Sequence, residues 1–129
     1  MPYTTTWTED GGIIWNYSGL LTGAEVIRSN MEIYGDERFD SLRYQIVDLR
    51  EVTANEISKA DMRKIGHLDM AAARSNPRVR VAVVTEDPVG AEISQFYAEI
   101  TRGSPWKMAI FRKMDDALAW AKGDGDDGQ

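Results

Sequence analysis

The sequence predicts a single α/β domain on a mixed sheet of about five strands, and three observations support this fold class. Its 129 residues suit one domain. Apolar residues make up 43% of the chain and charged residues 28%, as in globular proteins. A hairpin pattern is followed by apolar strands that alternate with amphipathic helices, which favours right-handed parallel crossovers. We predict the order ββαβαβα with a final helix.

The chain opens with two β-branched and aromatic runs, residues 3–7 and 13–17. Residues 9–12, Glu-Asp-Gly-Gly, join them and suit the positive φ angles of a tight turn. Since two strands alone leave aromatic area exposed, we expect the face with the Trp and Tyr side chains to be covered by a helix or by a second copy of the chain. The second alternative predicts a homodimer.

The first half of the chain then contains two helices and a strand. Thr22 with Glu25 forms a capping-box pattern that opens a helix up to Gly35. Residues 44–49 read as a strand, and a polar loop leads to Ser58, the predicted N-cap of a second helix that stops before residues 76–77.

The second half repeats strand and helix twice. Residues 78–84 form a valine-rich strand, and Asp87 with Pro88 opens a third helix. Residues 107–111 form the last strand and residues 115–122 the last helix, which Gly123 closes. We therefore place one domain at residues 1–122 and a flexible acidic tail at 123–129.

Composition excludes several functions. The net charge of −6 disfavours nucleic acid and anionic lipid surfaces. The chain has no cysteine and one histidine, and neither GxGxxG nor GxxxxGK[ST] occurs, so we expect no metal and no cofactor. The chain opens without a basic leader, and no apolar run reaches the roughly 18 residues of a membrane span. We expect a cytoplasmic protein without membrane insertion.

The order of motifs along the chain resembles the SpoIIAA-like family of STAS-type folds. The likeness rests on residues 19–22 before the first helix, 36–40 after it, 47–50 at the end of a strand, 81–84, and 110–120 with their acidic pair, Ala and Trp. It spans most of residues 13–122. The resemblance implies an STAS-like or Sec14-like fold and a regulatory or protein-binding role, without a substrate.

The family's anti-sigma-factor antagonists carry a phosphorylatable serine in an Asp-Ser-Ser/Thr-Gly motif where a strand meets its helix. This chain has Asp-Leu-Arg-Glu-Val-Thr at 48–53 instead. Ser58 is the nearest hydroxyl at a helix start, and we expect it to cap the helix. The resemblance therefore carries no phosphorylation site over to this chain.

The carboxyl ends of parallel strands are the default ligand site of an open sheet. This edge gathers one carboxylate, two arginines and a threonine as candidate ligand or partner residues, together with Glu86: Asp48, Arg50, Thr85 and Arg112. The third helix opens with two carboxylates, which disfavours nucleotide phosphate there.

Two polar residues fall within apolar helix faces. Asp69 lies between Met62 and Ile65 on the helical wheel, so it is either a functional acid or a carboxylate with a structural partner. Asn30 lies similarly in the first helix and can fix a register or line a small pocket. His67 falls on the opposite side with two arginines, as a surface histidine does.

No complete catalytic constellation appears, so we expect no enzyme. The leading hypothesis is a non-catalytic regulatory or protein-interaction module, with itself among the partners. The alternative is a small apolar-ligand carrier of the Sec14-like, lipid-binding type. Its cavity would be lined by side chains of the second and third helices: Met62, Met70, Ile93, Phe96 and Tyr97.

Overall fold

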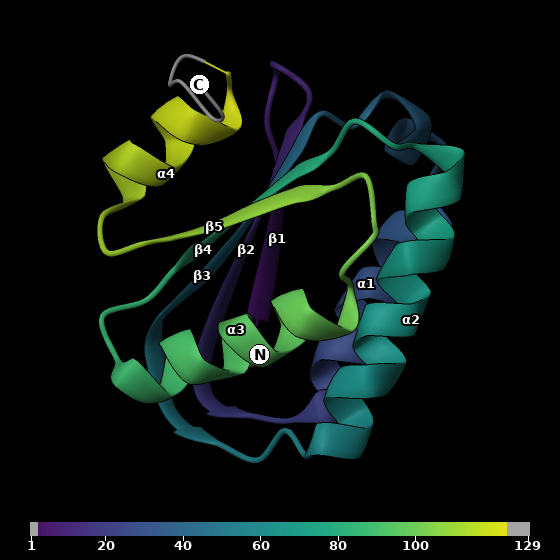
Figure 1. Ribbon diagram of the computed structural model, residues 1–129. Helices are drawn as coiled ribbons and strands as arrows, with labels where there is room; N and C mark the ends of the chain where they lie inside the picture. The colour runs from purple at the N-terminus through teal and green to yellow at the C-terminus, as the bar shows by residue number, and fades with distance from the viewer. Residues whose placement is uncertain (1–2, 124–129) are drawn as a thin grey trace.

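The computed structural model describes residues 3–123, except for the side chain of Val89, and shows a sheet with helices on both faces (Figure 1). The elements follow in the order β1 (Tyr3–Trp7), β2 (Gly12–Leu21), α1 (Gly23–Tyr34), a 3₁₀ turn (Glu37–Ser41), β3 (Tyr44–Asn55), α2 (Lys59–Ser75), β4 (Arg80–Val84), α3 (Pro88–Ile100), β5 (Lys107–Phe111) and α4 (Met114–Ala121). The predicted fold class is confirmed, and every strand and helix predicted by its residues is present; only the summary order, ββαβαβα with a final helix, omits one of these strands. From residue 124 on, the predicted acidic tail lies outside the described residues.

The five strands lie side by side in chain order, β1-β2-β3-β4-β5. β1 pairs antiparallel with β2, and each later pair is parallel. Since every crossover steps in the same direction along the sheet and is right-handed, α1, α2 and α3 lie on one face. α4 follows the last strand and packs on the opposite face (Figure 1).

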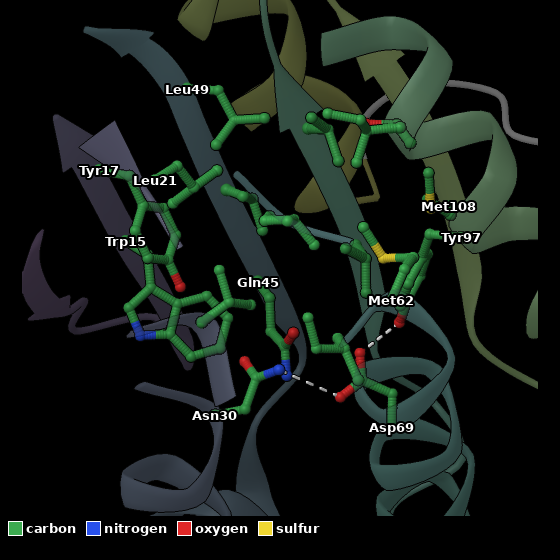
Figure 2. A pocket seen from close by; sticks show the side chains of 18 residues that line it. Trp15, Tyr17, Leu21, Asn30, Gln45, Leu49, Met62, Asp69, Tyr97 and Met108 are labelled. Atoms are coloured by element: carbon green, nitrogen blue, oxygen red, sulfur yellow. Dashed lines mark hydrogen bonds between the residues drawn. The ribbon is translucent and has the colours of Figure 1, made fainter. Parts of the chain in front are cut away.

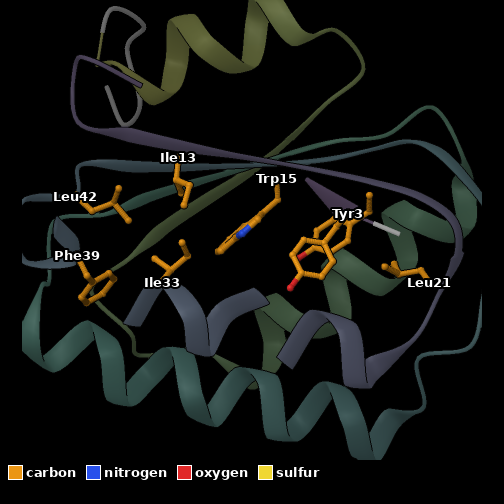
Figure 3. Close-up of a cluster of buried hydrophobic side chains, with 8 residues drawn as sticks. Tyr3, Ile13, Trp15, Leu21, Ile33, Phe39 and Leu42 are labelled. Atoms are coloured by element: carbon orange, nitrogen blue, oxygen red, sulfur yellow. The ribbon is translucent and has the colours of Figure 1, made fainter. Parts of the chain in front are cut away.

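The aromatic side chains of the hairpin belong to the core beneath α1 (Figure 3). Tyr3, Trp15 and Tyr17 are buried, and Tyr17 shares a hydrogen bond with Ser29 of α1. Trp7 is half-buried, and the guanidinium of Arg38 lies 4.0 Å from its ring centroid. The helix of the same chain therefore covers this face, and an uncovered aromatic patch for a second copy is not present.

The core beneath α4 is built from smaller side chains. Ala117 and Ala121 of α4 are buried against Ala82 and Val84 of β4, which lets the short helix approach the sheet closely. Gly12 belongs here as well, because a Cβ at this position would lie 2.0 Å from the ring of Tyr44. α4 thus covers the middle of the sheet and leaves its face open towards the carboxyl ends of β2 and β3 (Figure 1).

β2 and β3 run further than the sequence indicated. They continue as a parallel pair as far as Leu21 and Asn55, and the register shifts opposite Asn16–Ser18 and Gly19–Leu20, where β3 has one extra residue each time. Gly19 has φ +69°, which a side chain rarely tolerates. The extension is polar on β3, so its strand character comes from pairing with β2 rather than from an apolar pattern.

The predicted caps at the starts of α1 and α2 are confirmed. Thr22 and Glu25 form a reciprocal capping box at α1, and Ser58 and Asp61 form one at α2. α4 begins at Met114, and Gly123 follows its last turn with φ +84°. No helix within residues 3–123 is long and apolar enough to cross a membrane.

Candidate functional site

A cavity of about 100 Å³ lies between the sheet and the three helices on its α1 face (Figure 2). Its walls are mostly apolar, with side chains from β2, β3, β4 and β5 on one side and from α1, α2 and α3 on the other. Among its polar lining residues, Asn30 and Tyr97 donate hydrogen bonds to one carboxylate, that of Asp69, and the Gln45 amide lies at the same end of the cavity. Ser94 also lines the cavity, but its hydroxyl donates to the backbone carbonyl of Gly90 at 2.9 Å.

Asp69 is buried on α2, and its carboxylate has the hydrogen-bond partners that a buried charge requires. The hydroxyl groups of Tyr34 and Tyr97 both donate short hydrogen bonds to its carboxylate, one to each oxygen. Asn30 Nδ2 donates a third bond, 3.5 Å long. α1, α2 and α3 therefore meet at this carboxylate, with Asn30 and Tyr97 drawn beside it in Figure 2.

The ionisation of this cluster is set by burial and only partly offset by its hydrogen bonds. Burial raises the pKa of Asp69 to about 6, and the hydroxyls of Tyr34 and Tyr97 act in the opposite direction. Burial and the nearby Asp69 charge also raise the pKa of both tyrosines well above its ordinary value. All hydrogen-bond partners of the carboxylate are neutral, so it binds its proton at a higher pH than an ordinary aspartate, near pH 6, and is mostly ionised at pH 7.

Two buried donors of the α1 face lack a hydrogen-bond partner among the described residues. They are the indole Nε1 of Trp15 and the amide Nε2 of Gln45. Both side chains are 2% exposed and line the cavity. The Gln45 amide lies near the Tyr34 hydroxyl and slightly offsets the rise in its pKa, without a hydrogen bond from its Nε2. It therefore lies at the Asp69 end of the cavity (Figure 2).

A second, more polar groove of about 230 Å³ opens beyond the cavity, between the extended β2–β3 pair and the start of α3. Leu21, Leu49 and Ile93 line both the groove and the cavity. Thr85, Asp87 and residues 52–55 complete the groove wall. These shared apolar side chains form the boundary between the cavity and the carboxyl edge of the sheet.

The predicted edge residues divide between the two faces of the sheet. Asp48 is on the α4 face, where Arg50 binds it through Nε and Nη2, each at 2.9 Å, and Asn16 Nδ2 donates to it at 2.9 Å. Burial raises the pKa of Asp48, yet the bonds from Arg50 and Asn16 together hold that pKa below its ordinary value.

Thr85 and Arg112 do not join Asp48. Thr85 is buried on the helix side and accepts a hydrogen bond from the backbone N–H of Asp87 at 3.2 Å, so its hydroxyl organises the turn into α3. Arg112 is exposed after β5. Asp69 is in the inner cavity rather than at this edge, so the structure places the five predicted ligand or partner residues in four separate positions, with only Asp48 and Arg50 in contact.

Three of the five side chains predicted to line an apolar cavity do so: Met62, Ile93 and Tyr97. Met70 and Phe96 do not line it. The Phe96 ring instead faces Lys59 and Arg63, whose charged groups lie 5.8 and 5.9 Å from its centroid. Helical spacing places a residue on a face only approximately, and Phe96 lies at the outer side of the α2–α3 contact. His67 is exposed, as predicted.

Sequence reasoning missed Gln45. The residue was read as part of a strand, and a glutamine with buried strand neighbours on both sides was the signal that could have singled it out. Asn30 and Asp69 were both singled out, but on separate helices. That they form one cluster follows only from the packing of α1 against α2.

The chemistry available here is hydrogen bonding around one protonatable carboxylate. Within residues 3–123, no group of three or more His, Cys, Asp or Glu side chains is arranged to hold a metal ion. The cavity lining includes neither a hydroxyl–imidazole pair nor a lysine. The cluster can thus bind a polar group and exchange a proton, but it lacks a nucleophile with an adjacent base.

Comparison with solved structures shows which known fold this architecture matches. No family model and no curated protein matches the sequence. Among solved structures, the anti-sigma factor antagonist SpoIIAA in its unphosphorylated form superimposes with a TM-score of 0.64, over 94% of this chain and 98% of that chain, at 12% identity. The fold is SpoIIAA-like. The resemblance drawn from the motifs is thereby confirmed for the fold.

A second SpoIIAA-like structure supports the same conclusion. An uncharacterised protein of the DUF3478 family from Shewanella loihica, described as having a SpoIIAA-like fold, matches with a TM-score of 0.54 and 13% identity, over 92% of this chain and 91% of that chain. At such identities the likeness concerns the SpoIIAA-like fold alone.

Ser58, at the start of α2, is engaged in its capping box: its Oγ accepts a hydrogen bond from the backbone N–H of Asp61 at 3.0 Å.

Proposed function

We propose that this chain is a non-catalytic regulatory module that acts by binding another protein. The observation that carries the proposal is the structural match with SpoIIAA over nearly the full length of both chains. SpoIIAA is an anti-sigma factor antagonist, so its action is on another protein rather than on a metabolite.

The size of the cavity supports a module over a lipid carrier. A volume of about 100 Å³ is far below the roughly 300–1,000 Å³ of ordinary ligand pockets. A lipid chain would require the helices to move away from the sheet. The buried carboxylate also supports a non-catalytic role, because its two oxygens already accept three hydrogen bonds from neighbouring side chains.

We place the partner contact at the carboxyl edge of the sheet. Arg50 and Arg112 are exposed there, and Glu51 and Glu86 are close enough to Arg50 to raise its pKa, after the larger effect of Asp48. Charges of both signs on a rigid sheet edge provide specificity and steering for a protein partner of complementary pattern.

Cross-linking followed by affinity purification from the source cells tests this proposal. The wild-type chain should capture a defined partner that saturates at a fixed stoichiometry. The double variant Arg50→Glu and Arg112→Glu should weaken that capture by at least about tenfold, as charge reversal at an interface does. The matched control is Arg74→Glu with Arg102→Glu, two exposed arginines, one on α2 and one in the turn after α3. Equal capture by both double variants would refute the contact site, and no saturable partner would refute the module.

Self-association is a separate question. Burial of the hairpin aromatics beneath α1 removes the reason for which a homodimer was predicted. Native mass spectrometry checks it directly: a single species at 14.5 kDa would exclude a stable dimer, and a species of twice that mass would restore it. The cytoplasmic location stays a prediction.

A further inference from the structure

The side-chain amide of Gln45 is a buried hydrogen-bond donor that lines the cavity of about 100 Å³. Its Nε2 has no hydrogen-bond partner among the described residues, and the side chain is 2% exposed. A buried donor of this kind is normally satisfied by protein, water or ligand. No part of the proposed protein contact uses this group, so it calls for a separate explanation.

We propose that the cavity is a binding site for a small neutral molecule with one hydroxyl group, of the class of short aliphatic alcohols. The hydroxyl oxygen accepts a hydrogen bond from Gln45 Nε2, and the hydroxyl proton is donated to the carboxylate of Asp69. The alkyl chain then occupies the apolar remainder of the cavity. This inference does not depend on the proposed function.

The hydrogen-bonding capacity of Asp69 fits this arrangement. An ionised carboxylate offers about four acceptor positions. The hydroxyls of Tyr34 and Tyr97 and the amide of Asn30 occupy three of them. One position therefore stays available for a donor, next to an amide that requires an acceptor. A hydroxyl group is both, whereas a ketone or an ether would satisfy Gln45 alone.

Charge selects against ionised ligands. Asp69 is the single carboxylate among the lining residues, and they include neither lysine nor arginine. A carboxylate ligand would meet like charge without compensation. An ammonium group would pair with Asp69 but would offer no acceptor to Gln45, and its desolvation in an apolar cavity is costly. A neutral hydroxyl compound avoids both penalties.

Size narrows the class further. A cavity of about 100 Å³ exceeds the roughly 30 Å³ of one water molecule and is below the roughly 150 Å³ of a cavity that holds benzene. Four or five heavy atoms fit. Longer chains would have to pass between Leu21, Leu49 and Ile93 into the outer groove, which is the route of entry that the shared lining suggests.

NMR titration of the full chain with 1-butanol tests the proposal. Saturable shifts should appear at the Gln45 side-chain amide and at the methyl groups of Val47, Val81 and Val83, all of which line the cavity. From ethanol to 1-butanol, the affinity should rise about fourfold per methylene, as burial of apolar groups predicts. Butyrate and butylammonium at pH 7.5 should bind at least about tenfold more weakly than 1-butanol.

Two variants with the same substitution separate the site from general effects of alcohol. Gln45→Met keeps the chain length and removes the donor, and should weaken 1-butanol binding about tenfold, the effect of one buried hydrogen bond. Gln95→Met, at an exposed position of α3, should leave the affinity unchanged.

Equal affinity of Gln45→Met and wild type would overturn the proposal. So would the absence of a saturable shift up to 50 mM 1-butanol, roughly fifty times a Kd of 1 mM. If Gln45→Met does not fold, intermolecular NOEs between 1-butanol and the cavity methyls of the wild type decide the question. If NOEs from water to these methyl groups stay unchanged when 1-butanol is added, the cavity is filled with water, and the proposed alcohol site is refuted. Partner capture is measured without alcohol, so failure here leaves the proposed function unaffected.

Discussion

Two aspartates in this molecule have almost equally small exposed fractions, yet their pKa values are shifted in opposite directions. Asp48 is 5% exposed and Asp69 is 6% exposed. The pKa of Asp48 is held below its ordinary value, whereas that of Asp69 is raised to about 6. Burial raises the pKa in both cases, so burial alone does not explain the difference.

The charge of the partners and the depth of the site both contribute: Asp69 lies deeper, among three helices and the sheet, and its partners carry no charge. Asp48 receives two hydrogen bonds from the guanidinium of Arg50, a positive group that favours the ionised carboxylate. Asp69 receives its bonds from two tyrosine hydroxyls and an amide, all neutral, so they offset only part of the desolvation. The open α4 face near Asp48 thus has a fixed ion pair, and the closed α1 face near Asp69 has a group that titrates.

The largest expected effect is a pH-dependent loss of stability caused by Asp69. Its folded pKa of about 6 exceeds the ordinary value of 3.8, so between these values the folded state binds more protons than the unfolded state. The free energy of unfolding therefore falls as pH rises from 3.8 to about 6, by about 3 kcal/mol for this group. Urea denaturation of wild type and Asp69→Asn at pH 4 and pH 7 measures it.

The Asp69→Asn variant shows how much of the pH dependence of stability comes from Asp69. Asp69→Asn should lack this component, so its stability relative to wild type should improve by about 3 kcal/mol between pH 4 and pH 7. A constant difference between the two proteins across this range would show that Asp69 has an ordinary pKa, and the contrast with Asp48 would disappear.

A smaller effect should follow from Tyr97→Phe. The variant removes one of the two hydroxyl donors to Asp69, so the pKa of Asp69 should rise further. Stability at pH 7 should fall by about 2 kcal/mol, within the roughly 1.5–3 kcal/mol of one hydrogen bond to a charged group. A pH titration of the Asp69 carboxyl carbon by NMR should show a higher midpoint, and an unchanged midpoint would mean that this hydroxyl does not act on the ionised form. Tyr3→Phe, whose hydroxyl bonds Glu32 instead, is the matched control.

The smallest effect is expected at the ion pair. Arg50→Gln removes the positive partner of Asp48, so the pKa of Asp48 should rise towards or above its ordinary value. The side chain of Arg50 is 38% exposed, so solvent screens the pair and the loss of stability at pH 7 should be at most about 1 kcal/mol. This component is present at neutral pH and lost as pH falls, opposite in sign to that of Asp69. Thermal unfolding in low and in 1 M salt checks it, and a loss that salt does not reduce would argue against an electrostatic origin.

Local features of the sequence were sufficient to predict each strand and helix, the two capping boxes, and the two polar residues within apolar helix faces, Asn30 and Asp69. These features act over three or four residues, so a sequence shows them directly. The extension of β3 to Asn55 was not predicted, because its residues are polar and form a strand only by pairing with β2.

The sequence by itself thus determined the fold class and marked Asp69 as a carboxylate in need of a partner. Only the tertiary structure decided who that partner is, because Asn30 and Tyr34 precede Asp69 by 39 and 35 residues and Tyr97 follows it by 28. The tertiary structure also determined that Arg50 pairs with Asp48, whereas the hydrogen-bond partners of Asp69 are all neutral. It further determined that the Gln45 amide lines the cavity. These outcomes depend on how three helices pack on one face of the sheet, and no local periodicity encodes that packing.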